Sequence, residues 1–175
     1  FIGNNQTRLN LDFPQAHQRV QMVEYMENRF GKDFGVYGMG WENSQTVNPG
    51  EEVEIYNRAD IVITQNHFFD PGYTSDRLWR SLACQAFTIS QYYEGIEGDI
   101  CCSHTWKTFD QLGNLCEFVL QDEMYQSHFA VLDHRYFFFF FLWKHRFEKI
   151  INQLKINATD RFTDTGIVRS IIEHH

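Results

Sequence analysis

The sequence predicts an α/β fold in which a parallel sheet is flanked by helices. Short apolar runs of strand length alternate with longer segments whose apolar residues recur at three- and four-residue steps. Residues 60–64 form a compact apolar run, typical of a strand buried on both faces of a parallel sheet. This alternation is expected of a sheet wound in the Rossmann manner.

The first half of the chain is expected to supply a strand end, a long helix, a short helix and two strands. Residues 1–3 have the character of a strand end. Pro14 suits the first turn of a helix over residues 14–30, and Gly31 suits its end. The remaining elements are a strand at residues 34–37, a helix at residues 51–59 with acids in its first turn, and a strand at residues 60–64.

The second half is expected to continue the alternation. Ser75 should cap one helix and Asp110 another, which we expect to run on through Leu132. Strands are predicted at residues 86–89 and 105–109. A last helix is predicted around Phe147, Ile150, Ile151 and Leu154.

Composition and charge narrow the class of protein. Of the 175 residues, 43% are hydrophobic and 22% are charged, as in globular domains. The net charge is −8 and the basic residues are scattered, which argues against a nucleic-acid partner. The aromatic run at residues 136–143 is too short for a membrane span, which needs about 20 apolar residues. With no signal peptide and no disulfide framework visible, we expect a cytoplasmic protein.

Ligands of such sheets bind beyond the carboxyl ends of the strands, so the loops there hold the candidate site residues. The first loop carries Gly3 and Asn4, which could let backbone and amide donors approach a phosphate, or could form an ordinary tight turn. The loops at residues 38–41 and 64–76 add Gly40, Trp41 and Asn66 as further candidates.

Two other segments carry charged residues near the expected carboxyl ends of the strands. Ser75, Asp76 and Arg77 open a helix, where free N–H groups favour an anion and Arg77 could hold a diphosphate. The alternative is a plain serine cap beside a solvated ion pair. In the loop at residues 91–98, a carboxylate could accept sugar hydroxyls, or the loop could be a solvated acidic turn. Its candidates are Glu94, Gly95, Ile96 and Glu97.

No recognised catalytic or metal motif stands out. The spacing of Cys101, Cys102 and His104 matches no standard zinc site, and the sequence shows no second cluster of ligands. We therefore expect no bound metal. The order Ser-His-Asp, a phosphate P-loop and HExxH do not occur, so the catalytic residues remain unknown.

Several segments together carry a family resemblance. They are FIGNN with the helix after it, VYGMGW, EIYNRADIVIT, SDRLWRSLACQAFTISQYYEGIEGD, and a helix after TWKTFDQL. In this order and spacing, over residues 1–122, they resemble the C-terminal domain of GT-B glycosyltransferases, particularly the CgeB-like, group 1 branch. The resemblance implies one half of a GT-B fold that grips a nucleotide-diphosphate sugar as substrate. It also implies a partner N-terminal domain and no need for a cofactor or divalent metal.

The chain departs from this family at two positions. Relatives carry a ribose-binding Glu where this chain has Arg80, and a glycine where it has Gln85. Arg80 either meets phosphate or marks an altered site. Two alternatives to donor binding therefore stay open: a non-catalytic Rossmann-like binding module, and a sugar-nucleotide epimerase, against which the absence of GxGxxG counts.

The resemblance also suggests a domain organisation. Residues 1–133 are expected to form the nucleotide-sugar-binding domain, and residues 173–175 resemble a tag remnant. Residues 134–172 are expected to form a helical extension that packs on this domain or on the N-terminal one. Its aromatic run, Phe137–Phe141 with Trp143, would then leave an apolar patch when the chain is alone.

Overall fold

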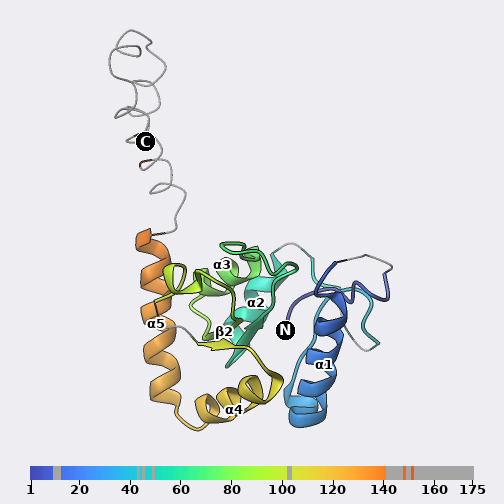
Figure 1. Ribbon diagram of the computed structural model, residues 1–175. Helices are drawn as coiled ribbons and strands as arrows, with labels where there is room; N and C mark the ends of the chain where they lie inside the picture. The colour runs from blue at the N-terminus through green and yellow to red at the C-terminus, as the bar shows by residue number, and fades with distance from the viewer. Residues whose placement is uncertain are drawn as a thin grey trace, which may run out of the picture. The chain divides into compact units, whose positions relative to one another are not determined.

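A computed structural model describes residues 1–9, 13–42, 44, 46–48, 50–101, 104–140, 148 and 151. The chain divides into two compact units, Phe1–Phe138 and Phe139–His175, and the first contains the sheet. The predicted α/β class is confirmed, because helices flank a parallel three-stranded sheet in this unit (Figure 1).

The sheet consists of three short strands in the order β1-β2-β3. Their bounds are Val62–Thr64 for β1, Thr88–Gln91 for β2 and Thr105–Trp106 for β3. Both pairings are parallel, with Ile63 opposite Ile89 and Ser90 opposite Thr105. All three strands therefore end at the same edge of the sheet, which we call the carboxyl edge.

Two further segments run side by side near the amino terminus. Ile2 and Tyr37 form an isolated parallel bridge, and the Gly3 N–H donates to the Tyr37 carbonyl at 2.8 Å. The predicted strand at residues 34–37 is thus reduced to a single bridge. A Cβ at Gly38, whose φ is +130°, would lie 2.6 Å from the Gly3 carbonyl oxygen, so only glycine permits this close approach.

One face of the sheet packs against α1 (Ala16–Phe30) and α4 (Phe109–Leu120). The buried side chains of this main core come mainly from the sheet and from both helices. They include Ile63, Ile89 and Trp106 from the strands, Met22, Val23 and Met26 from α1, and Leu112, Cys116 and Val119 from α4, and Phe1, Phe87 and Ala130 of α5 complete the cluster. The long helix expected at residues 14–30 is confirmed, two residues shorter at its start.

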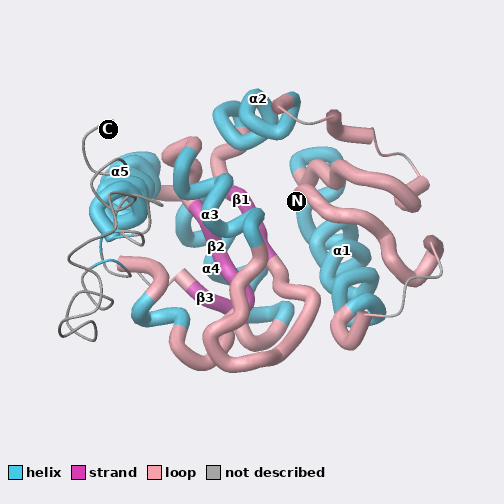
Figure 2. The backbone as a smooth tube through the Cα atoms, turned by 90° about the horizontal axis from the view of Figure 1, so that it is seen from above, coloured by secondary structure: helices cyan, strands magenta, loops and turns pink. Residues whose placement is uncertain are grey.

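The other face packs against α2 (Glu51–Arg58) and α3 (Asp76–Ala83). Val62, the neighbour of Ile63 in β1, packs with the buried Tyr56 of α2. The Thr88 hydroxyl of β2 donates to the Ser81 hydroxyl of α3 at 3.0 Å. Successive strand residues thus point to opposite layers of helices, as in a sheet buried on both faces. In Figure 2 the strands lie between α1 and α5.

Side-chain caps set the starts of α3, α4 and α5. Ser75 caps α3 as predicted, its hydroxyl accepting from the Arg77 N–H. The prediction that Asp110 caps α4 is wrong, because Thr108 and Gln111 form a reciprocal capping box two residues earlier. The helix expected to continue to Leu132 is broken, since Asp122 accepts from the Tyr125 N–H and starts α5 (Glu123–Phe140).

The start of the predicted extension packs on the first unit itself. Phe137 of α5 stacks on Trp79 of α3, with ring centroids 6.0 Å apart. Phe138 remains 42% exposed, so the rings of this run are not fully buried in the first unit. Residues 141–147, with Trp143 and Phe147, lie outside the described residues, as do Ile150, Leu154 and residues 173–175. The boundary expected at residue 133 stays a prediction.

Gln85 adopts a left-handed backbone conformation, with φ of +57°, directly after α3. A side chain costs about 1–2 kcal/mol in this conformation, whereas glycine adopts it freely. The resemblance places a glycine here, and the geometry supplies the reason.

We therefore expect Gln85→Gly to raise the free energy of unfolding by about 1 kcal/mol. Gln85→Val should lower it, because a β-branched residue tolerates positive φ poorly. Urea unfolding followed by circular dichroism measures both changes. A glycine variant less stable than the wild type would contradict this account of the turn.

Candidate functional site

A small cavity of about 230 Å³ lies where the first loop, the residue 38–39 turn and the start of α3 meet. It is lined by five of the predicted site residues, namely Gly3, Asn4, Asp76, Arg77 and Arg80. Residues far apart in the sequence are brought together here, because the parallel bridge between Ile2 and Tyr37 sets the first loop beside the residue 38–39 turn.

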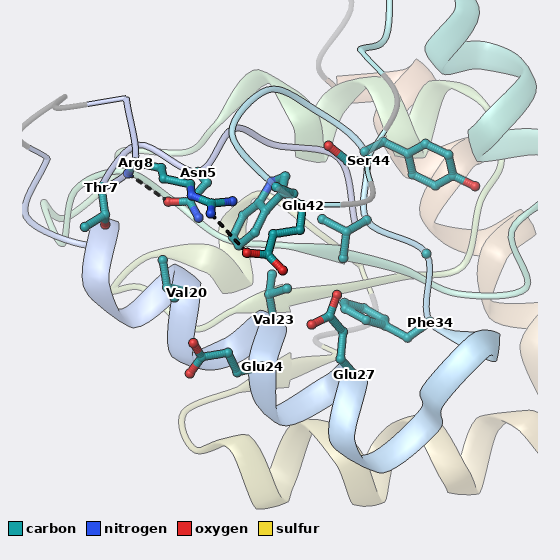
Figure 3. Close-up of a pocket in the computed structure, with 14 residues that line it drawn as sticks. Asn5, Thr7, Arg8, Val20, Val23, Glu24, Glu27, Phe34, Glu42 and Ser44 are labelled. Atoms are coloured by element: carbon teal, nitrogen blue, oxygen red, sulfur yellow. Dashed lines mark hydrogen bonds and ion pairs between the residues drawn. The ribbon is translucent and has the colours of Figure 1, made fainter.

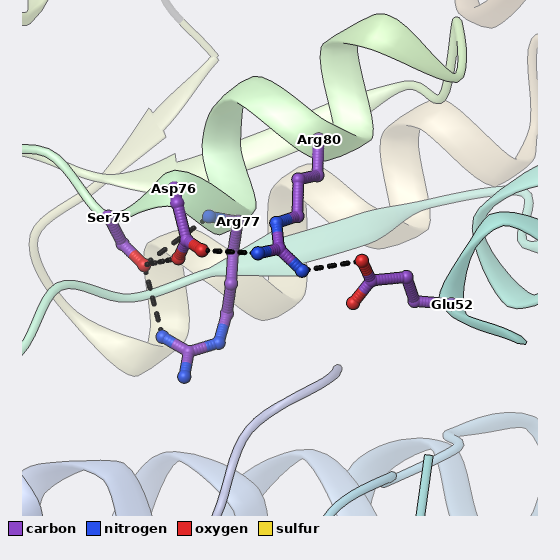
Figure 4. A network of polar contacts seen from close by, with 5 residues as sticks. All are labelled: Glu52, Ser75, Asp76, Arg77 and Arg80. Atoms are coloured by element: carbon purple, nitrogen blue, oxygen red, sulfur yellow. Dashed lines mark hydrogen bonds and ion pairs between the residues drawn. The ribbon is translucent and has the colours of Figure 1, made fainter. Parts of the chain in front are cut away.

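Arg77 and Ser75 form the polar start of α3. The Ser75 hydroxyl lies 3.0 Å from Nη1 of Arg77 and accepts from it, as well as from the Arg77 N–H (Figure 4). Asn66 holds this turn, because its Oδ1 accepts from the Ser75 N–H and its Nδ2 donates to the Tyr73 carbonyl, both at 2.9 Å. Asn66 is therefore placed to shape the loop that presents Arg77.

Arg80 lies between two carboxylates and is paired with both. Its guanidinium contacts Glu52 of α2 at 2.5 Å and Asp76 at 2.9 Å (Figure 4). Glu52 was not among the predicted site residues, because the sequence showed it only as one of several acids in a first helical turn. In the structure its carboxylate lines the same cavity as Arg77.

The loop with Glu94, Gly95, Ile96 and Glu97 is not part of this cavity. Ile96 is fully buried in a core cluster with Leu78 and Leu82, and its N–H donates to the Tyr93 carbonyl. Glu94 and Glu97 are exposed, and the Glu94 carbonyl accepts from the Gly72 N–H at 3.1 Å. The structure therefore joins this loop to the residue 70–73 segment instead of to Gly3.

Trp41 and Gly40 connect the first two loops. The Trp41 indole donates to the Gly3 carbonyl at 2.6 Å, and a Cβ at Gly40 would lie 2.9 Å from the Asn5 carbonyl oxygen. Trp41 also lines a separate, open cavity of about 840 Å³ beside α1. There Glu27 projects from α1 toward the loop that carries Glu42 (Figure 3). Glu24 lines the same cavity, and the arginine that lines it, Arg8, pairs with Glu42, so this cavity is acidic.

Arg19, in the first turns of α1, is the functional candidate that the sequence reasoning missed. It is 1% exposed, and its guanidinium donates to the Gln6 side chain at 3.1 Å and to the Gln65 carbonyl at 3.4 Å. Its Nε has no partner, and across the described ranges Arg19 forms no salt bridge. A buried cation is thus compensated only by neutral groups.

Arg19 and Arg77 are close enough to act on each other electrostatically. Burial, together with the charge of Arg77, lowers the pKa of Arg19 to about 9. His67 lies 3.4 Å from Arg19, and burial together with the two arginines lowers the pKa of His67 to about 4. His67 therefore stays neutral beside the two arginines.

A local signal could have identified both arginines. Arg19 and Arg77 each lie near the start of a helix, where the helix dipole disfavours a cation and favours an anion. A cation placed there, near the end of a parallel strand, is unfavourable for the helix dipole and carries a charge without an acidic partner among the described residues. An anion bound at that place can offset both costs.

The chain belongs to the glycosyl transferase-like family, whose model it matches over residues 18–152. This membership supports a role in glycosyl transfer. The parallel sheet with its flanking helices is consistent with a Rossmann-like half of a GT-B fold. No curated protein and no solved structure gave a significant match.

Two features are absent from the part of the chain that the structure describes. No helix there is long and apolar enough to cross a membrane. No group of three or more His, Cys, Asp or Glu side chains there could hold a metal ion. His104 is buried and Cys101 exposed, while Cys102 falls outside the described residues.

The low pKa of His67 predicts a pH dependence of stability. The unfolded chain takes up a proton on this residue near pH 6.5, whereas the folded chain does so only near pH 4. The stability that neutral His67 contributes is therefore complete above pH 6.5 and lost as the pH falls toward 4.

We expect His67→Gln to lose less stability than the wild type between pH 7 and pH 4.5, as measured by urea unfolding at about these two values. His17→Gln, at an exposed position of α1, is the matched control and should follow the wild type. Equal pH dependence in all three proteins would show that His67 is not held neutral by its surroundings.

Proposed function

We propose that the chain is the donor-binding part of a glycosyltransferase and that it binds a nucleotide-diphosphate sugar for transfer to an acceptor. The observation that carries this proposal is the buried Arg19, whose charge has no opposite partner among the described residues. An uncompensated buried charge is costly, and an anionic ligand would offset that cost.

A diphosphate fits the two arginines better than a single charge does. Arg19 lies near the start of α1 and Arg77 at the start of α3, and burial, followed by the charge of Arg77, lowers the pKa of Arg19. Each helix N-terminus, together with its arginine, can hold one of the two phosphoryl groups. The same groups would stabilise the charge of a diphosphate as it leaves the sugar, so the mechanism requires no divalent metal.

The finer assignment extends the family resemblance. We place the chain as the C-terminal half of a GT-B enzyme of the CgeB-like branch, acting in the cytoplasm with an N-terminal domain that supplies the acceptor site. Gly3 and Asn4 border the cavity of Arg77, and they are assigned to the approach of the donor.

A second candidate is a non-catalytic nucleotide-binding module. The observation that favours it is Arg80, which relatives replace by a ribose-binding glutamate and which here pairs with Glu52 and Asp76. The two candidates differ in outcome: a transferase releases free nucleotide diphosphate when an acceptor is supplied, whereas a binding module does not.

Calorimetric titration with UDP-, GDP- and TDP-sugars tests donor binding. Replacing Arg77 or Arg19 by Met should weaken the binding of the best of these ligands by about 1.5–3 kcal/mol, because each removes a charge-assisted contact. Arg58→Met, at an exposed position of α2, is the matched control and should bind as the wild type does.

Binding should also weaken with added salt, since the contacts are ionic. If none of the three ligands binds saturably to the wild type, or if both site variants bind as tightly as Arg58→Met, the proposal fails.

A further inference from the structure

Four glutamine side chains meet at the carboxyl edge, and we call them the glutamine cluster. Gln15 and Gln18 come from the start of α1, Gln65 follows β1, and Gln91 ends β2. Gln15, Gln65 and Gln91 are 1%, 0% and 4% exposed, while Gln18 is half-buried. Four amides drawn from three elements are thus enclosed at the edge where ligands of such sheets bind.

The cluster does not satisfy its own hydrogen-bonding groups. Gln18 Oε1 accepts from Gln91 Nε2 at 2.9 Å and from Gln65 Nε2 at 3.4 Å, and Gln15 Oε1 lies 3.5 Å from Gln65 Nε2. Within the described part of the chain, Gln15 Nε2, Gln65 Oε1 and Gln91 Oε1 have no partner. Turning the Gln65 amide alone by half a turn would set its oxygen against Gln18 Oε1. Exchanging N and O in all four amides keeps the same contacts in the opposite direction and again leaves three atoms unpaired, so no exchange closes the network.

Buried polar groups in native proteins are nearly always paired, so these three atoms indicate a missing partner. With the amides as placed, one of these atoms is a donor and two are acceptors, and the amides are uncharged. Under either assignment of the amides at least one donor and one acceptor stay unpaired, so neither a phosphate, which cannot donate, nor a cation, which cannot accept, completes the set. A hydroxyl group does both, as a water molecule does, and at the edge where ligands of such sheets bind a ring with several hydroxyls matches this pattern.

The glutamine cluster adjoins the proposed anion site. The backbone carbonyl of Gln65 accepts from Nη2 of Arg19 at 3.4 Å, and Arg19 lies one residue after Gln18 in α1. A ligand whose phosphate meets Arg19 would therefore bring an attached group to the amides.

We propose that the glutamine cluster is the subsite for the hydroxyl groups of the donor's sugar ring. This assignment rests on the proposed function, since it takes the diphosphate at Arg19 as the anchor of the ligand. Recognition by amides alone suits a neutral hexose, because no carboxylate or ammonium group belongs to the cluster.

The test separates the sugar from the nucleotide. Each protein is titrated by calorimetry with UDP and UDP-glucose, GDP and GDP-mannose, and TDP and TDP-glucose, and the ratio of the two Kd values is taken for each pair that binds. Gln65→Met and Gln91→Met replace an amide by an apolar group of similar length. Gln21→Met, at an exposed position of the same helix α1, is the matched control.

We expect the ratio of sugar-nucleotide Kd to nucleotide Kd to rise about tenfold in Gln65→Met and Gln91→Met, as for the loss of one or two ligand hydrogen bonds. The Kd of the free diphosphate should change by less than about twofold, because Arg19 and Arg77 are untouched. Stability should be unchanged or higher, since an amide with an unpaired atom has been removed.

An unchanged ratio in both variants, with diphosphate binding retained, would overturn the sugar subsite and leave the proposed function standing. A loss of stability without a change in the ratio would do the same and would mark the amides as a link between α1 and the sheet. Failure of every free diphosphate to bind the wild type would instead overturn the proposed function, and the sugar subsite with it.

Discussion

The charge of Arg19 is the constraint on which the functional account depends. The guanidinium is buried against the first loop and the residue after β1, yet only neutral groups contact it, and Arg77 adds a second positive charge nearby. Such an arrangement costs stability in the free protein and becomes favourable when an anion binds. His67 is held neutral by burial and by the same two arginines.

The fold explains why these groups converge. Parallel strands end at one edge, and each is followed by a loop that leads to the start of a helix, so helix N-termini and strand ends face the same region. Gly38 lets the residue 37–39 segment pass against the Gly3 carbonyl, and the Trp41 indole fixes the two loops together. Hydrogen bonds from Ser75 and Asn66 hold the turn that presents Arg77. The backbone of this turn therefore sets the position of Arg77 in the wall of the cavity of about 230 Å³.

Much of the fold could be predicted from apolar periodicity, because core positions such as Met22 and Met26 repeat along a helix whatever it packs against. The Ser75 cap could also be predicted, because it depends only on residues next to it in the sequence. Thr108 and not Asp110 caps α4, because Thr108 and Gln111 form a reciprocal pair of hydrogen bonds. The residue type of Asp110 alone does not reveal this. The site was harder to predict: Arg19 and Glu52 gain their roles from neighbours dozens of positions away. Ile96 was expected near a ligand, yet its burial depends on α3 packing over it.

Phosphate placement tests the central claim most directly. In a crystal structure of the chain with the nucleotide diphosphate that binds it best, we expect the phosphate oxygens to lie within hydrogen-bonding distance of both Arg19 and Arg77. We also expect the Arg19 Nε, which has no partner in the free protein, to donate to one of them. A diphosphate bound elsewhere, for instance in the acidic cavity beside α1, with Arg19 still surrounded only by neutral groups, would contradict the account.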